Sequence, residues 1–312
     1  MTSVTSVQEA GWLESSAGIR ALDDRVLVSV QGDDARTWLN GQITNDVRST
    51  QPGDAVYALA IHVKGRVLAD LFVLDRGERG LAMTLPRQNL PALLEHFDRY
   101  IIMEDVVLEP DEGVALLTIQ GPRAAEVEAG LELESYACDR LGRGGRDVVV
   151  PSAARDVTLA TLADRARAIG GGPVSDEGWE LARLRAGQPA LFADFGENTY
   201  PQEAGLEHGA VSFQKGCYLG QEVVCMLENR GQLSRRLVAL ESEAELERGL
   251  EIKDGSGAKL GEITSAVRDP ARERTLALGF VKRAHASEGT ELATERGALR
   301  VTALPGGSAS GS

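Results

Sequence analysis

The pattern of apolar and polar positions along the chain predicts strands and helices in an irregular order. Two apolar, β-branched runs at 55–63 and 67–74 flank Lys64-Gly65-Arg66, which is typical of a hairpin with glycine in its turn. A proline followed by leucines at helical spacing predicts a helix over 86–100. The other predicted elements are strands at 26–31, 101–108 and 113–119, helices at 34–40 (ended by Gly41), 123–131 and 156–169, and a helix capped by Ser175. Because strands and helices do not alternate regularly, we expect an α+β fold with antiparallel sheets.

The last quarter of the chain has a different pattern, in which short apolar runs recur between turns. These predicted strands lie at 236–240, 259–264, 275–281 and 299–303. Evenly spaced short strands with glycine-rich turns predict a small β-barrel. We therefore divide the chain into a region of two α+β lobes at 1–232, a barrel at 233–304 and a flexible Gly/Ser tail at 305–312.

Composition narrows the classes of protein and of site that the chain fits. The 312 residues carry a net charge of −14, which disfavours a direct nucleic-acid-binding face because phosphate binding needs clustered Lys and Arg. The start has no charged and apolar leader pattern, and no window reaches the ~20 apolar residues of a membrane span, so we expect a cytoplasmic protein without a membrane contact. Three cysteines and four histidines without ligand spacing predict neither disulfides nor a metal site.

The densest chemistry lies at 212–222, Ser-Phe-Gln-Lys-Gly-Cys-Tyr-Leu-Gly-Gln-Glu. Neither strand nor helix periodicity calls for these residue types. Glycines at 216 and 220 allow a tight turn that carries Cys217 and Tyr218 on its outer edge, and Lys215 would favour the thiolate form of Cys217. The alternative is that Cys217 and Tyr218 are core residues and the glycines mark an ordinary turn.

Two further polar features stand out. Asn45 and Asp46 belong to a polar stretch just after a predicted helix end, where such residues commonly satisfy their own loop backbone. Asp70 interrupts an apolar strand, so its carboxylate either points outward to solvent or must find partners or a cavity.

Residues 215–222, Lys-Gly-Cys-Tyr-x-Gly-Gln-Glu, resemble the signature of the YgfZ-like folate-binding proteins, relatives of the glycine-cleavage T-protein (aminomethyltransferase) that assist iron–sulfur cluster assembly. The resemblance covers nearly the whole chain. It implies an aminomethyltransferase-like fold of three lobes around a central hole that holds tetrahydrofolate or another reduced folate.

The resemblance also implies roles for particular residues. Glu203, in a Pro-x-Glu segment, would accept hydrogen bonds from the pterin ring, and Arg230 would lie near the glutamate tail. Further folate-binding candidates are Tyr218, Gln221, Asn45 and Asp46. Cys217 is the candidate functional thiol, with Lys215 and Asp70 as the other candidate catalytic residues.

The chain departs from its aminomethyltransferase relatives in two places. Ala69-Asp70 stands where those relatives carry two adjacent aspartates, and Cys225-Met226 stands where relatives commonly have Ala-Arg. One carboxylate that would orient an amine is therefore missing.

Three functions compete. We expect a tetrahydrofolate-binding factor that assists the assembly, repair or transfer of iron–sulfur clusters and indirectly supports tRNA-modifying radical enzymes. Its contacts with iron–sulfur assembly proteins or client enzymes would be transient. Whether it is an enzyme stays open. The alternative is a tetrahydrofolate-dependent aminomethyl- or methyltransferase. A third, a Cys-nucleophile hydrolase with His208 as base, lacks a third orienting group.

Overall fold

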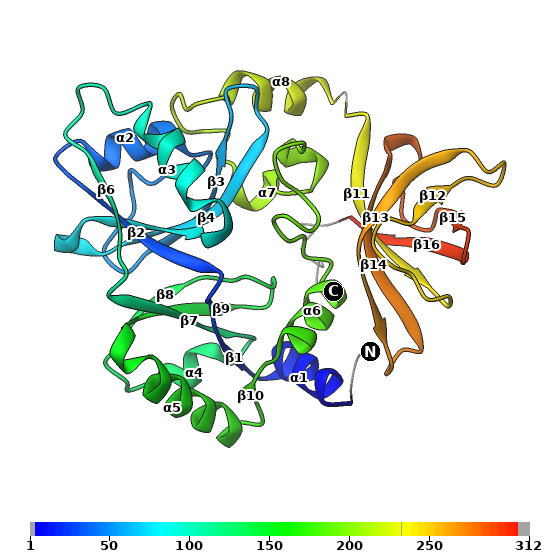
Figure 1. The fold of residues 1–312 in the computed structure, drawn as a ribbon, viewed down its shortest axis with the longest axis horizontal. Coiled ribbons are helices and arrows are strands. Elements are labelled where there is room, and N and C mark those ends of the chain that lie inside the picture. Colours follow the sequence, from blue (N-terminus) through cyan, green and yellow to red (C-terminus); the bar gives the residue numbers. More distant parts are fainter. Residues whose placement is uncertain (1–3, 232, 305–312) are drawn as a thin grey trace. The chain divides into compact units, whose positions relative to one another are not determined.

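The computed structural model describes residues 4–231 and 233–304, with the side chains of Val4 and Arg230 outside that description. The chain forms two compact units (Figure 1). The two-sheet unit comprises Trp12–Pro173 and Gly209–Glu222, and the barrel unit comprises the described residues of Met1–Gly11, Val174–His208 and Val223–Ser312. The chain thus leaves the two-sheet unit after Pro173 and returns to it for the stretch that contains Cys217.

The two-sheet unit contains two five-stranded sheets. The first has the order β3-β4-β5-β2-β6, with β2 Arg25–Gln31, β3 Ala55–Ile61, β4 Val67–Asp75, β5 Leu81–Pro86 and β6 Val107–Pro110. The second has the order β10-β1-β7-β9-β8, with β1 Gly18–Ala21, β7 Val114–Gln120, β8 Glu134–Ala137, β9 Gly145–Pro151 and β10 Gly172–Pro173. The helices of this unit are α2 Ala35–Gln42, α3 Leu90–Asp98, α4 Ala124–Glu128 and α5 Arg155–Ala168.

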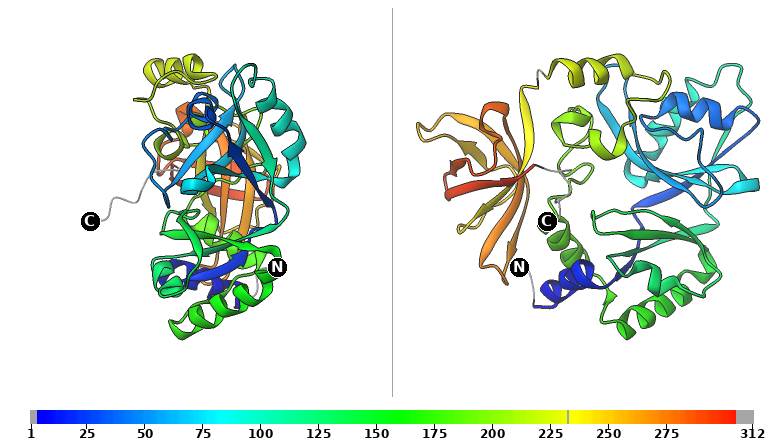
Figure 2. Two further views of the ribbon diagram at one scale, coloured as in Figure 1. Left: turned by 90° about the vertical axis from the view of Figure 1, so that its left-hand side faces the viewer. Right: turned by 180° about the vertical axis from the view of Figure 1, so that it is seen from behind.

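Alternation along the strands of the second sheet builds two cores. Leu116 of β7 joins a cluster with Leu27 and Phe72 of the first sheet, whereas its neighbour Leu117 joins a cluster with Leu162 of α5. Successive side chains of a strand point to opposite faces, so the central strands β7 and β9 are apolar on both sides. Helix α5 covers the face of the second sheet that is turned away from the first (Figure 2).

The barrel unit is built around six strands that close into a barrel in the order β11-β14-β13-β12-β15-β16. They are β11 Arg235–Ser242, β12 Glu251–Lys253, β13 Lys259–Asp269, β14 Arg274–Lys282, β15 Glu291–Thr294 and β16 Gly297–Ala303. Helix α6 Asp176–Arg185 belongs to this unit, while α1 Val4–Ser15, α7 Glu207–Ala210 and α8 Gln221–Arg230 each cross a unit boundary in sequence. Short 3-10 turns complete the list: Gly77–Arg79, Arg87–Asn89, Ser152–Ala154, Pro201–Glu203 and Arg283–His285.

The predicted α+β class, the hairpin and the C-terminal barrel are confirmed. Ser175 caps α6 as predicted, since its Oγ accepts a hydrogen bond of 3.1 Å from the Gly178 N–H. Two predictions were wrong in detail. Helix α2 continues through Gly41 to Gln42, and only the end of the strand predicted at 101–108 is extended, because β6 begins at Val107. The predicted domain boundary at 232 stays a prediction, and the tail at 305–312 lies outside the described residues.

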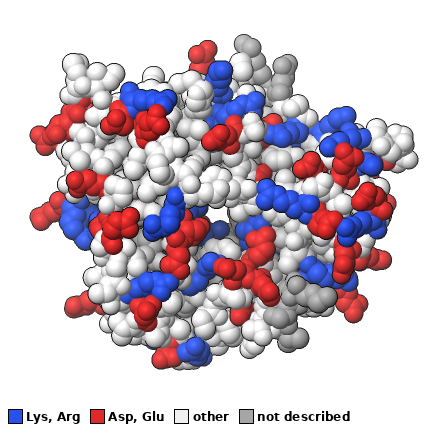
Figure 3. All heavy atoms as spheres, in the orientation of Figure 1, with Lys and Arg blue, Asp and Glu red and all other residues white. Residues whose placement is uncertain are grey.

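Charged side chains of both signs are interspersed on the face drawn in Figure 3. No helix of the described part of the chain is long and apolar enough to cross a membrane.

Candidate functional site

Buried and exposed side chains alternate in the cysteine loop, residues 212–220, between helices α7 and α8. Lys215 is 5% exposed and Tyr218 is 7% exposed, so both point into the two-sheet unit. Phe213 is 41% exposed, and the Cys217 thiol is exposed as well. Two buried residues therefore anchor the loop while Cys217, between them and next to Tyr218, is displayed at the surface.

Lys215 is held by backbone carbonyls. Its Nζ donates hydrogen bonds to the carbonyl oxygens of Asn40 at 2.6 Å, Ile43 at 2.8 Å and Asn45 at 2.7 Å, and it lies 5.1 Å from the centre of the Tyr218 ring. An ammonium group has three donors, so all of them are used. Burial lowers the pKa of Lys215 to about 8, which leaves the amine largely protonated at neutral pH.

This arrangement gives Lys215 a role that the sequence did not predict. We expected Lys215 to favour the thiolate of Cys217, and this stays a prediction; the structure shows that all three of its hydrogens are donated to main-chain carbonyls. Its observed role is to tie the cysteine loop to the end of helix α2. Whether it takes part in chemistry stays a prediction.

Main-chain hydrogen bonds strengthen the same attachment. The N–H of Ser212 donates to the carbonyl of Thr44, and the N–H of Leu219 donates to the carbonyl of Gly41, both at 3.0 Å. The Thr44 hydroxyl donates in return to the carbonyl of Ala210 at 2.6 Å. The end of helix α2 and the polar stretch after it therefore hold the cysteine loop in place through these hydrogen bonds.

The two glycines of the loop have different roles. Gly220 adopts a φ of +77°, and a Cβ there would lie 2.6 Å from the His62 carbonyl oxygen, so only glycine fits. Gly216 does not have a positive φ, and a Cβ built on it would meet nothing within 4 Å. The prediction that both glycines serve the turn is thus correct for Gly220 alone.

Asn45, Asp46 and Gln221 mostly satisfy their own surroundings. The Asn45 side-chain amide donates to the Tyr57 carbonyl at 2.9 Å, and its Oδ1 accepts from the Asp46 N–H at 2.9 Å. A hydrogen bond from the Arg48 guanidinium, 2.7 Å from the carboxylate, lowers the pKa of Asp46 to about 2. Gln221 reaches the Gly216 carbonyl at 3.4 Å. Their folate-binding role stays a prediction.

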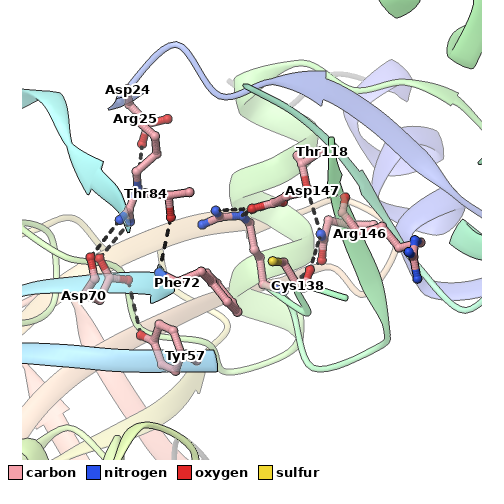
Figure 4. A network of polar contacts seen from close by, with 12 residues as sticks. Asp24, Arg25, Tyr57, Asp70, Phe72, Thr84, Thr118, Cys138, Arg146 and Asp147 are labelled. Atoms are coloured by element: carbon pink, nitrogen blue, oxygen red, sulfur yellow. Dashed lines mark hydrogen bonds and ion pairs between the residues drawn. The ribbon is translucent and has the colours of Figure 1, made fainter. Parts of the chain in front are cut away.

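Asp70 has found partners inside the two-sheet unit. Its Oδ1 accepts a hydrogen bond of 2.8 Å from Arg25 Nη2, and its Oδ2 accepts one of 3.2 Å from the Tyr57 hydroxyl. Figure 4 shows Arg25 and Tyr57 converging on this carboxylate. Burial, followed by the negative charge of Asp70, raises the pKa of Tyr57 well above its usual value. Asp70 is therefore engaged on both oxygens, and a catalytic role for it stays a prediction.

The second thiol of this unit, Cys138, lies in the same region as Asp70 (Figure 4) but is fully buried. Beside it, Arg140 pairs with Asp147 at 2.5 Å. Burial, followed by the negative charge of Asp147, raises the pKa of Cys138 well above its usual value. Cys225, on α8, is half-buried, and burial raises the pKa of its thiol.

In the barrel unit, Glu203 is 5% exposed and already paired. Both of its oxygens accept hydrogen bonds from Arg235 at 3.2 Å, and its Oε2 accepts another from the Tyr200 N–H at 3.1 Å. Its pterin-binding role stays a prediction. Arg230 ends helix α8, and its predicted role near the glutamate tail falls on a side chain outside the described residues.

Sequence reasoning missed two neighbours of Glu203. Glu207 is 5% exposed, lies 3.2 Å from Arg236 Nη2, and has its pKa raised by burial. Gln202 is 3% exposed, and its amide donates to the Val224 carbonyl at 2.8 Å. Within the described part of the chain, Glu207 Oε2 and Gln202 Oε1 are buried and accept no hydrogen bond. The sequence did contain a signal for this pairing. Two glutamates lie four positions apart, at 203 and 207, and their partners are the consecutive arginines at 235 and 236.

His208, the base of the hydrolase alternative, is 62% exposed on its side chain and lies 3.5 Å from Glu207. No group of three or more His, Cys, Asp or Glu within residues 4–231 and 233–304 could hold a metal ion.

Comparison with protein-family models matches residues 3–141 to the GCVT N-terminal domain and residues 235–305 to the glycine cleavage T-protein C-terminal barrel domain. The tRNA-modifying protein YgfZ of Escherichia fergusonii is 28% identical over 270 residues, which cover 80% of this chain and 81% of that protein. The chain belongs to the glycine cleavage T-protein superfamily and is YgfZ-like. YgfZ of Yersinia pestis is also 28% identical, over 235 residues that cover 72% of this chain and 71% of the relative.

A solved structure supports the same fold for this YgfZ-like chain. The glycine cleavage system aminomethyltransferase T from Bartonella henselae superposes with a TM-score of 0.84, covering 97% of this chain and 90% of that one. At 23% sequence identity, this likeness concerns the fold alone. The predicted aminomethyltransferase-like fold is confirmed.

Proposed function

We propose that this YgfZ-like protein binds a reduced folate such as tetrahydrofolate and assists the assembly, repair or transfer of iron–sulfur clusters. It would contact assembly proteins or client enzymes transiently and support tRNA modification indirectly, since its YgfZ relatives are named tRNA-modifying proteins. The proposal has two parts, each supported by residues of one unit.

Support for folate binding comes from the buried acceptors of residues 202–207. A buried oxygen without a donor is costly, typically ~1–3 kcal/mol, and such groups usually have a partner. Glu207 Oε2 and Gln202 Oε1 are two such oxygens among the described residues, and they lie on the same short segment as Glu203. A pterin presents a 2-amino group and a ring N–H as adjacent donors, so the donor-rich edge of a folate fits this acceptor-rich segment. These unpaired acceptors are the observation that carries the folate proposal.

Support for the cluster-related role comes from Cys217. A thiolate is a ligand for iron and for other soft metals, and an exposed thiol on a firmly anchored loop can reach a partner without unfolding. Among the described residues, Cys217 is not part of a group of metal ligands. A single thiol suits a transient contact with a cluster that is handed to another protein, rather than a cluster that this protein holds permanently.

The transferase alternative receives no support from the site. Ala69 is fully buried, and both oxygens of Asp70 are engaged by Arg25 and Tyr57. We expect no aminomethyl transfer by the purified protein, and robust turnover on a glycine-cleavage intermediate would favour the alternative.

Titration with tetrahydrofolate tests the folate proposal. Glu207→Gln and Glu203→Gln keep the side-chain shape but replace an acceptor oxygen with an N–H donor, which should weaken binding roughly tenfold to a hundredfold. Glu251→Gln, at an exposed position of barrel strand β12, is the matched control and should bind like wild type. Equal affinities for all four proteins would remove these carboxylates from the site, and the absence of binding to wild type would remove folate.

A further inference from the structure

The loop between helix α3 and strand β6 displays two adjacent large apolar side chains. Ile102 is 82% exposed and Met103 is 92% exposed, and Val107, which begins β6 at the edge of its sheet, is 51% exposed. Single exposed apolar residues are common on protein surfaces and need no explanation. Two neighbours at a loop tip that contribute almost nothing to the core are available to another molecule.

Hydrogen bonds fix the backbone under these side chains. The Glu104 carboxylate accepts from the N–H groups of Ile102 at 2.9 Å and Met103 at 3.0 Å, which lowers the pKa of Glu104. The Trp38 indole donates to the carbonyl of Tyr100 at 2.9 Å. Side chains presented on an ordered backbone lose less conformational freedom when they bind.

The far end of the loop is fixed as well. The Asp105 N–H donates to Asp34 Oδ2 at 2.9 Å, and the Asp33 N–H donates to Asp105 Oδ2 at 3.1 Å. Gly32 has a φ of +113°, and a Cβ there would lie 2.0 Å from the Asp105 carbonyl oxygen. The fold thus uses a glycine to bring the loop against residues 32–34.

Carboxylates surround the displayed pair. Asp33, Asp34, Glu104 and Asp105 are all exposed, and the nearby Arg99 is paired with Glu95. A negative rim repels anionic lipid headgroups and nucleic acids and attracts a positively charged surface. It also disfavours a second copy of this chain, whose net charge is −14.

We propose that Ile102 and Met103 insert into an apolar pocket on a partner protein whose rim carries Lys and Arg. The apolar pair would supply most of the affinity, because buried anchors dominate interfaces, and the carboxylates would steer the partner and set its orientation. This surface is separate in sequence from the cysteine loop and does not rest on the proposed folate or cluster role.

The experiment places a photo-cross-linking amino acid, p-benzoylphenylalanine, at position 103 of the full chain in the cells from which its gene comes. The control position is Val157, which is 65% exposed on helix α5 of the same unit. We expect one protein to be cross-linked at 103 and not at 157. That protein is then purified and titrated with wild type, Met103→Ser, Asp33→Lys and Val157→Ser.

The expected result is a loss of affinity of about tenfold or more for Met103→Ser, a smaller loss for Asp33→Lys together with weakening by added salt, and wild-type affinity for Val157→Ser. The proposal is overturned by the same cross-links at both positions, by none at 103, by an adduct of the chain with itself, or by equal affinities in the titration. Sedimentation of wild type, but not of Met103→Ser, with vesicles of phosphatidylcholine and phosphatidylglycerol would instead indicate a lipid surface and would also overturn it.

Discussion

Cys138 and Cys217 belong to the same compact unit but have opposite surroundings. Cys138 is fully buried in a cluster with Leu27 and Phe72, and burial and the charge of Asp147 raise its pKa. Cys217 is exposed on a loop that the buried Lys215 holds against three carbonyls. The exposure of a cysteine therefore depends on how its segment is anchored and not on the residue type. Here the buried Lys215 anchors the loop on which the Cys217 thiol is exposed.

Thiol labelling should separate the two cysteines by the largest factor. In the folded protein, Cys217 should alkylate at least about 10³ times faster than Cys138, which reacts only after local opening. Cys225 should be intermediate, because it is half-buried and burial raises its pKa. Single-cysteine variants treated with iodoacetamide and followed by mass spectrometry measure the rates.

Full labelling of all three variants in urea is the control for intrinsic reactivity. Comparable rates for Cys138 and Cys217 in the native protein would mean that the contrast between the two sites does not exist in solution.

Lys215→Met should destabilise the protein by about 2–4 kcal/mol, because methionine fills the apolar part of the site but leaves buried carbonyls of Asn40, Ile43 and Asn45 without this donor. It should also make main-chain amides of the loop exchange faster. Lys64→Met, at an exposed hairpin tip of the same unit, should change stability by less than about 0.5 kcal/mol. Urea unfolding of both variants measures the difference, and equal midpoints would show that the carbonyl contacts do not support the loop.

The smallest expected effect depends on pH. Cys138→Ala should cost about 1–2 kcal/mol at pH 7. Because the folded-state pKa of Cys138 is raised, the unfolded chain loses this proton first, above about pH 8.5. Wild-type stability then falls with rising pH by at most ~1.4 kcal/mol per unit from this group, and the variant lacks that loss. The cost of Cys138→Ala should therefore shrink between pH 8 and 10.

Cys217→Ala provides the comparison for that pH series. Its cost should stay below about 0.5 kcal/mol and should not follow the Cys138 curve. Parallel curves for the two alanine variants would contradict the assignment of one buried and one displayed thiol.

The parts of the fold that sequence predicted depend on local signals. The hairpin of β3 and β4 has an apolar, β-branched run on each side of Gly65, and the start of α6 has Ser175 as its cap. Helix α1 was missed because it has no regular apolar stripe and is held by contacts far along the chain, such as the hydrogen bond of 3.0 Å from the Ser175 N–H to the Glu9 carboxylate. Short strands such as β8 likewise depend on a partner, here β9, rather than on their own pattern.

The features of the candidate site also differ in whether they depend on nearby residues or on distant parts of the chain. Exposure of Cys217 on a turn with Gly220 could be predicted, because it depends on residues within the loop. The role of Lys215 could not, since its acceptors are main-chain carbonyls about 170 positions earlier, and every residue type has such a carbonyl. For Asp70, two alternatives were open from the sequence, exposure to solvent or buried partners, and nothing local pointed to Arg25 and Tyr57.

We propose that the function depends on the exposed Cys217 thiol. The most direct test is complementation of cells that lack the native gene, read as the activity of an iron–sulfur enzyme at equal protein levels. We expect Cys217→Ala to fail, whereas Cys225→Ala and Cys138→Ala, where they accumulate, should restore activity. Full restoration by Cys217→Ala would contradict it and would leave the cysteine loop as a structural turn.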